Sequence, residues 1–282
     1  MRYTLLHEKL LAEYGKKCRN RRPHWKRSLT VAKIPVAIQM YTLREDCSKD
    51  FVGTLKAVAK IGYAGVELAG MYGVAPKELG KILDDLGLKR AGGHWGVEPL
   101  EKEFDKTVED VKALGSSFVT IPGLPGSYTE DAEAWKRTAA LLSGIGQKLL
   151  KEGIQLSYHN HNHEFKLFGG KHGLDILYEN SDPKALHAEI DTYWVQYAGV
   201  DPATYMKKVA NRLSLVHIKD MADDDMKSFA EIGNGILDWD AIFAVAKEAG
   251  SKWLIVEQDS CKRPPLESAK ISFENLKTMG AV

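Results

Sequence analysis

The sequence predicts a single parallel (β/α)₈ barrel over residues 34–282, preceded by a basic N-terminal arm over residues 1–33. The chain has 282 residues, and about 250 residues are typical of this fold. Eight short β-rich runs alternate with helical patterns from residue 34 onward, which is typical of a parallel sheet. The count of eight favours closure of that sheet into a barrel.

The expected strands are short runs bounded by turn or helix signals: Val36–Met40, Gly65–Leu68, Arg90–His94, Phe118–Ile121, Ile154–His159, Ala185–Ile190, Leu213–Ile218 and Trp253–Glu257. Apolar residues recur at helical spacing between most of them, for example over Phe51–Ile61, Lys77–Leu86, Val108–Leu114 and Ala132–Lys151. Four glycines (Gly62, Gly87, Gly153 and Gly250) follow helical segments, where a left-handed cap favours glycine.

An open doubly wound sheet is the alternative architecture. It commonly carries a GxGxxG motif between a strand and a helix. The sequence Gly233-Asn234-Gly235 is expected in a loop and lacks the third glycine of that motif. The barrel is therefore favoured.

Charge is distributed unevenly along the chain. Residues 1–33 contain ten Lys/Arg and two Glu, a net charge of +8, which leaves 29 basic and 36 acidic residues, a net charge of −7, in the remainder. A mildly acidic body argues against nucleic acid as a partner. The arm is expected to be a solvated leader or a contact within a homo-oligomer, with a nucleic-acid or membrane arm as the alternative. Five of its residues (Leu5, Leu6, Leu10, Leu11 and Tyr14) have the spacing of a short amphipathic helix.

Composition indicates a globular protein with a large core, since 44% of the residues are hydrophobic and 27% are charged. No stretch approaches the roughly 20 apolar residues that cross a bilayer. The three cysteines (Cys18, Cys47 and Cys261) are too scattered for a disulfide framework, and the arm lacks a secretory signal. We therefore expect a cytoplasmic protein without a membrane partner.

Polar residues end the last four expected strands, where the active-site face of such a barrel lies. The strand endings carry His159, Asp191, His217 and Glu257. Alternation along a strand places His159 and His161 on one face. Burying such groups costs several kcal/mol unless they are paired or bind a metal. Their mixed nitrogen and oxygen donors suit Mn²⁺, Zn²⁺, Co²⁺ or Fe²⁺ better than Ca²⁺. An ion-pair network at the barrel mouth is the alternative.

These strand endings resemble those of the sugar phosphate isomerase/epimerase family, within the xylose-isomerase-like superfamily of TIM barrels. The matching motifs are His-Asn-His-x-x-Glu-Phe over 159–165, Asp-Thr-Tyr-Trp over 191–194, His-Ile-Lys-Asp over 217–220 and Glu-Gln-Asp over 257–259. Residues 39–44 and 233–239 also fit the family. The resemblance implies one divalent metal held by the last four strands, with Mn²⁺ favoured and Zn²⁺, Co²⁺, Fe²⁺ or Mg²⁺ as alternatives.

One position departs from the family pattern. Many relatives have Glu where this sequence has His159. In those epimerases the carboxylates after strands five and eight exchange the proton as a pair. With an imidazole at this position, that two-carboxylate mechanism does not carry over intact.

The resemblance implies a sugar isomerase or epimerase that abstracts a proton next to the carbonyl of a keto sugar, through a metal-stabilised enediolate. His159, Asp191, His217 and Glu257 are the expected metal ligands. Glu257 is also the expected base, and Glu164 and His161 are further acid/base candidates. Substrate-binding candidates lie beside the mouth: Glu67, His94, Trp95, Trp194 and Lys219. Simple packing or a structural salt bridge is the alternative for Glu67, Lys219 and both tryptophans.

Three other functions are compatible with the sequence. Elimination from the same enediolate would give a lyase or dehydratase acting on a 3-keto sugar, a 3-keto-glycoside or a keto-inositol. A non-catalytic sugar-binding barrel would not need to retain metal. A DNA-repair endonuclease would be expected to have His at the position of Trp194.

Overall fold

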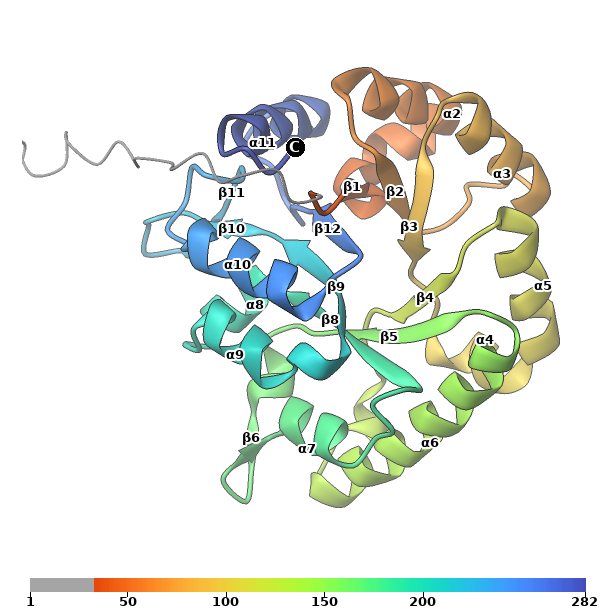
Figure 1. Ribbon diagram of the computed structural model, residues 1–282, viewed down its shortest axis with the longest axis vertical. Coiled ribbons are helices and arrows are strands. Elements are labelled where there is room, and N and C mark those ends of the chain that lie inside the picture. Colours follow the sequence, from red (N-terminus) through yellow and green to blue (C-terminus); the bar gives the residue numbers. More distant parts are fainter. Residues whose placement is uncertain (1–32) are drawn as a thin grey trace, which may run out of the picture. The chain divides into compact units, whose positions relative to one another are not determined.

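The computed structural model describes residues 33–282, so the expected arm lies outside the described residues except for Lys33. Eight parallel strands form a nearly closed barrel with helices around it (Figure 1). Their bounds are β1 Val36–Gln39, β2 Gly65–Leu68, β3 Lys89–Gly93, β4 Phe118–Ile121, β5 Gln155–His159, β8 Leu186–Asp191, β9 Leu213–Ile218 and β12 Trp253–Val256. The predicted barrel is confirmed.

The order of strands around the sheet is β3-β2-β1-β12-β9-β8-β5-β4. Strand β1 pairs in parallel with both β2 and β12, which joins the start of the barrel to its end. Between β3 and β4 the described residues form only an isolated parallel bridge, from His94 to Thr120. The barrel is therefore loosest between these two strands.

Helices connect the strands on the outside of the barrel (Figure 1). Their bounds are α2 Arg44–Ile61, α3 Pro76–Asp85, α4 Val97–Lys102, α5 Phe104–Leu114, α6 Ala132–Lys151, α7 Gly173–Glu179, α8 Thr192–Tyr197, α9 Pro202–Lys208, α10 Trp239–Ala249 and α11 Pro265–Thr278. Aspartates begin several of them: Asp131, Asp201 and Asp238 each accept a hydrogen bond from a backbone N–H in the first turn. None of these helices is long and apolar enough to cross a membrane.

Two antiparallel hairpins extend the loops at the site end of the barrel. Strands β6 (Leu167–Phe168) and β7 (Lys171–His172) follow β5, and strands β10 (Asp220–Met221) and β11 (Phe229–Ala230) follow β9. Their two-residue strands are too short to show a period in the sequence. Neither hairpin was predicted.

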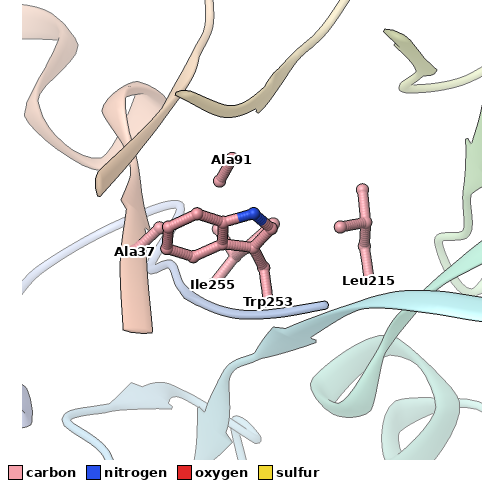
Figure 2. Close-up of a cluster of buried hydrophobic side chains, with 5 residues drawn as sticks. All are labelled: Ala37, Ala91, Leu215, Trp253 and Ile255. Atoms are coloured by element: carbon pink, nitrogen blue, oxygen red, sulfur yellow. The ribbon is translucent and has the colours of Figure 1, made fainter. Parts of the chain in front are cut away.

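The floor of the barrel is a small apolar cluster of Ala37, Ala91, Leu215, Trp253 and Ile255 (Figure 2). Figure 2 shows the Trp253 indole in one cluster with the small side chains of Ala37 and Ala91. Because side chains on one face of a strand recur every second residue, the next inward positions on three of these strands are Gln39, His217 and Glu257. The polar site therefore lies directly above an apolar floor.

Candidate metal centre and active site

Four polar side chains converge at the carboxyl end of the barrel. His159 and Asp191 end β5 and β8, His217 lies near the end of β9, and Glu257 follows β12 directly. One ligand atom from each lies within 4.8 Å of the others, and all four side chains are buried. The barrel topology thus brings together residues that are almost 100 positions apart in the sequence.

The two carboxylate oxygens of Asp191 have different partners. Oδ1 accepts the backbone N–H of Trp194 at 3.0 Å and caps α8. Oδ2 accepts no hydrogen bond; it is buried and forms an ion pair with Nζ of Lys219 at 3.0 Å, and it lies 3.7 Å from Nε2 of His159. Burial raises the pKa of Asp191 to about 6, although Lys219 and His217 oppose the shift. This oxygen faces positively charged and nitrogen-bearing groups, so its position is suited to a cation.

The two imidazoles face the cluster through different nitrogens. His159 turns Nε2 towards Asp191, while His217 places Nδ1 2.9 Å from Oε2 of Glu257. Burial, and then the neighbouring His217, lower the pKa of His159 well below its usual value, so it is neutral at physiological pH. Burial opposes protonation of His217, but Glu189 and Glu67 raise its pKa well above the usual value.

Lys219 is buried in the same cluster. Its Nζ lies 3.0 Å from Oδ2 of Asp191 and 2.8 Å from both Oε2 of Glu257 and Oδ1 of Asp259. Burial disfavours the charged form of Lys219 and lowers its pKa, but these three carboxylates outweigh burial and raise the pKa of Lys219 well above its usual value. The salt bridge that the sequence left open for Lys219 is present, and the side chain has almost no surface to offer a substrate.

A second polar layer lies next to the four converging residues. Glu67 was expected near the substrate, but its side chain is fully buried. Its Oε2 lies 2.6 Å from Nε2 of His217 and accepts from Nε2 of Gln39 at 2.8 Å. His94 is half-buried and places Nε2 3.2 Å from Glu189 and 3.4 Å from Glu67. These contacts favour a supporting role for Glu67 over substrate contact.

Glu189 is the residue of this layer that the sequence analysis missed. It is fully buried on β8 and lies within 3.2 Å of imidazole nitrogens of His94, His159 and His217. The signal was its position two residues before Asp191, which places both side chains on one face of the strand. The run Glu189-Ile190-Asp191 could have indicated it.

The loop after β5 is held by Glu164, which does not join the four converging residues. Its Oε1 accepts from the hydroxyl of Tyr158 at 2.9 Å, and its Oε2 accepts from the backbone N–H of His161 at 2.8 Å. Burial raises the pKa of Glu164. Tyr158 precedes His159 on the strand and therefore points to the opposite face. The expected acid/base role of Glu164 stays a prediction; its contacts favour anchoring of the loop.

Aromatic residues lie beside the site. The ring centroid of His161 is 5.0 Å from that of His159 and 5.6 Å from that of Trp194. Burial, and then Lys219, lower the pKa of His161 to about 4. Trp194 also packs against Phe229 and is only half-buried. Trp95 follows His94 at the β3–β4 junction, where its backbone N–H donates to the carbonyl oxygen of Thr120.

The donor set fits a divalent transition metal. His159 and His217 offer nitrogens, and Asp191 and Glu257 offer oxygens, in a buried group. Such mixed N/O sets are typical of Mn²⁺, Zn²⁺, Fe²⁺ and Co²⁺. Two neighbouring groups with similar spacing occur in the described residues, namely His94/His159/Glu189/His217 and His161/His163/Glu164. The group at the four strand ends is the one that the sequence analysis identified.

Comparisons with known proteins agree with this architecture. The sequence model described as xylose isomerase-like TIM barrel matches residues 55–279. An inosose dehydratase of Lacticaseibacillus casei is 27% identical over 247 residues, which cover 74% of this chain and 82% of that one. A crystal structure of a sugar phosphate isomerase/epimerase from Parabacteroides distasonis is 26% identical, with a TM-score of 0.76 over 92% of this chain and 99% of that one. The structure of an L-ribulose 3-epimerase, 17% identical with a TM-score of 0.68, shares the fold over 88% of this chain and 94% of that one.

Proposed function

Because the chain belongs to the xylose isomerase-like TIM barrel family, we propose that it is a metal-dependent enzyme that removes a proton next to a carbonyl in a small polyhydroxylated substrate. The convergence of the buried side chains of His159, Asp191, His217 and Glu257 is the observation that carries this proposal. These four residues would hold one divalent cation, with Mn²⁺ favoured. A cation held there would polarise the carbonyl and offset the negative charge that develops on proton removal.

Glu257 is the proposed base. Among the described residues, the hydrogen bonds and ion pairs of its side chain all use Oε2, which leaves Oε1 for a substrate proton. Burial opposes its ionisation, but Lys219 and His217 lower the pKa of Glu257 well below its usual value. A carboxylate that stays ionised is a weak base, so the carbon acid itself must be activated. This requirement supports a cation beside the carbonyl.

Elimination is the outcome that this set of residues favours. Glu257 takes the proton from the carbon next to the carbonyl, and a carbon–carbon double bond forms. The β-hydroxyl, or the β-alkoxyl of a glycoside, leaves with the proton that Glu257 returns to it, as water or an alcohol. An epimerase needs a second base on the opposite face of the carbon, and the corresponding residue here is the imidazole of His159. The dehydratase name of the Lacticaseibacillus relative supports this outcome. The proposed substrates are a keto-inositol, a 3-keto sugar or a 3-keto-glycoside.

Isomerisation or epimerisation, which the sequence analysis favoured, is the second candidate. The same proton is removed, but it returns to carbon without loss of water. The name of the Parabacteroides structure supports this candidate. Half-exposed side chains beside the site, namely Trp194 and His161, would contact the ring of either substrate.

Incubation with keto-inositols and 3-keto sugars in D₂O, with and without Mn²⁺, tests the proposal. In a parallel incubation in H₂O, elimination predicts a product lighter by one water (18 Da), or by the alcohol in the case of a glycoside, by mass spectrometry. In D₂O, epimerisation predicts deuterium uptake at carbon without loss of water or alcohol. Elemental analysis of the purified protein is the companion measurement. Absence of both metal and exchange across the panel would contradict the proposal and support a sugar-binding protein without catalysis.

A further inference from the structure

One carboxylate oxygen of Glu189 contacts nitrogens of three imidazoles. Oε1 lies 3.2 Å from Nε2 of His94, 3.2 Å from Nδ1 of His159 and 3.0 Å from Nε2 of His217. The other oxygen, Oε2, accepts from the hydroxyl of Thr120 at 2.9 Å. The whole side chain is buried on β8.

The two candidate ligand imidazoles need opposite tautomers. A neutral imidazole carries one N–H, and the nitrogen that binds a metal must be the other one. His159 faces the cluster through Nε2 and His217 through Nδ1, so the protons belong on Nδ1 and Nε2 respectively. Those two nitrogens are the ones in contact with Oε1 of Glu189.

We propose that Glu189 is a positioning residue that selects the tautomers of His159 and His217 and thereby sets the affinity of the site for a divalent cation. The inference deepens the proposed function and depends on it, because both imidazoles are ligands only if a metal binds. Glu67 assists on one side only, since its Oε2 contacts His217 and not His159.

Packing alone gives no reason for a carboxylate at this position. Glu189 and Glu67 both contact Nε2 of His217, at 3.0 and 2.6 Å, so two buried carboxylates lie close together. A buried carboxylate so close to another one costs free energy unless partners offset it. Carboxylates that accept the second N–H of a ligating imidazole commonly set metal affinity in this way.

The first test compares Glu189→Gln with the wild-type chain. Glutamine keeps the size of the side chain but removes the charge and adds a donor towards the imidazoles. Loss of such a support typically weakens metal binding 10–100-fold, which calorimetric titration with Mn²⁺ and Co²⁺ measures. We also expect the Co²⁺ absorption spectrum to change, since the ligand nitrogens would reorient.

Asp175→Asn is the matched control. Asp175 is a buried carboxylate on α7 that accepts from the hydroxyl of Tyr205 at 3.0 Å, outside the strand-end cluster. Its loss should lower the unfolding temperature and leave metal affinity unchanged. A Glu189→Gln variant that is folded and binds Mn²⁺ as tightly as the wild type, with the same Co²⁺ spectrum, would overturn the inference.

A milder variant covers the case in which Glu189→Gln does not fold. Thr120→Val removes the hydroxyl that holds Oε2 of Glu189 and keeps the carboxylate. We expect a smaller loss of affinity in the same direction, and unchanged affinity would overturn the inference. Two metal ions per wild-type chain, falling to one in Glu189→Gln, would also overturn it, because Glu189 would then be a ligand itself.

The ¹⁵N spectrum of histidine separates failure of this inference from failure of the proposed function. A wild-type chain that binds no divalent metal contradicts the proposed function. In that metal-free chain His159 is still expected to carry its proton on Nδ1, facing Glu189. The Nε2–H tautomer in the wild type would contradict the positioning role by itself.

Discussion

Lys219 places its Nζ 2.8 Å from Oε2 of Glu257, and both side chains are buried at the barrel mouth. The same nitrogen lies 3.0 Å from Oδ2 of Asp191. Both carboxylates belong to the four-residue cluster that could hold a metal. The ammonium group therefore offsets the charge of the cluster in the metal-free chain, and a bound cation would share or take over its partners.

Replacement of the Lys219 ammonium group by an apolar side chain, in Lys219→Met, should destabilise the metal-free protein. Removing one partner of a buried ion pair costs about 3–5 kcal/mol, because the remaining carboxylates are left uncompensated. A divalent cation should offset part of that loss. We therefore expect Mn²⁺ to raise the unfolding temperature more in Lys219→Met than in the wild type, as measured by calorimetry with and without EDTA.

Lys102→Met is the control for this prediction. Lys102 forms an exposed pair with Glu98 on α4, and such surface pairs contribute little to stability. Its unfolding temperature and its response to Mn²⁺ should match those of the wild type. An equal response to Mn²⁺ in Lys219→Met would show that the ammonium group and the metal do not share ligands.

The fold and the four converging residues follow from local patterns in the sequence. Short β-rich runs gave the strands, and the carboxyl ends of parallel strands must lie at one end of a barrel. His159, Asp191, His217 and Glu257 stand at such ends, so their convergence could be predicted without contacts. Alternation along β8 also places Glu189 on the face of Asp191, but Glu189 does not end its strand, so a pattern of strand endings does not include it.

The roles of Glu67 and Glu164 could not be predicted in the same way. Glu67 lies on an inward strand position, and only the three-dimensional contacts show that His217 and Gln39 occupy its Oε2. Glu164 follows a conspicuous pair of histidines, yet its oxygens accept from Tyr158 and the backbone of His161. Depth and side-chain direction in a loop depend on tertiary packing, which has no period in the sequence.

The loop after β9 gives a test of the local structure beside the site. Asp220 accepts hydrogen bonds from the backbone N–H groups of Gly233 and Gly235 and from Nε1 of Trp239. A Cβ atom at Gly235 would lie 2.2 Å from the carbonyl oxygen of Met221. Gly235→Ala should therefore displace the loop and cost about 1–3 kcal/mol, as overpacking does, measured by chemical denaturation.

Gly144→Ala serves as the comparison for Gly235→Ala. Gly144 lies in α6, and a Cβ there meets nothing within 4 Å. Alanine is favoured over glycine in a helix by up to about 1 kcal/mol, so this variant should gain stability. Equal stability of the two variants would contradict the proposed close packing around Asp220.

Metal binding should tighten as the pH rises. Burial raises the pKa of Asp191 to about 6, and Glu189 and Glu67 hold the pKa of His217 well above its usual value. A cation can bind only after these groups lose their protons. We expect release of about one proton per metal near pH 7, from His217, and about two below pH 6, where Asp191 is also protonated.

Calorimetric titration in buffers of different ionisation enthalpy counts those protons. In Asp191→Asn, affinity should be weaker at all pH values, and the extra proton released below pH 6 should disappear. In the metal-free chain, the stability of the fold changes with pH in the opposite direction to metal affinity. Because the pKa of Asp191 is raised above its ordinary 3.8, its contribution to stability falls as the pH rises from about 4 to about 6. Affinity that is independent of pH would contradict both protonation states.

Separate variants of Glu257 and His217 distinguish proton transfer from metal binding. Glu257→Gln keeps the shape and a ligand oxygen but removes the basic carboxylate. Turnover should fall by about 10²–10⁴-fold, the usual cost of losing a general base, while metal is at least partly retained. His217→Ala should lower metal occupancy itself, and high metal concentration should partly restore activity. Elemental analysis beside initial rates measures both effects. Full activity in Glu257→Gln would exclude it as the base, since Gln258 and Asp259, which follow it after β12, do not belong to the converging group.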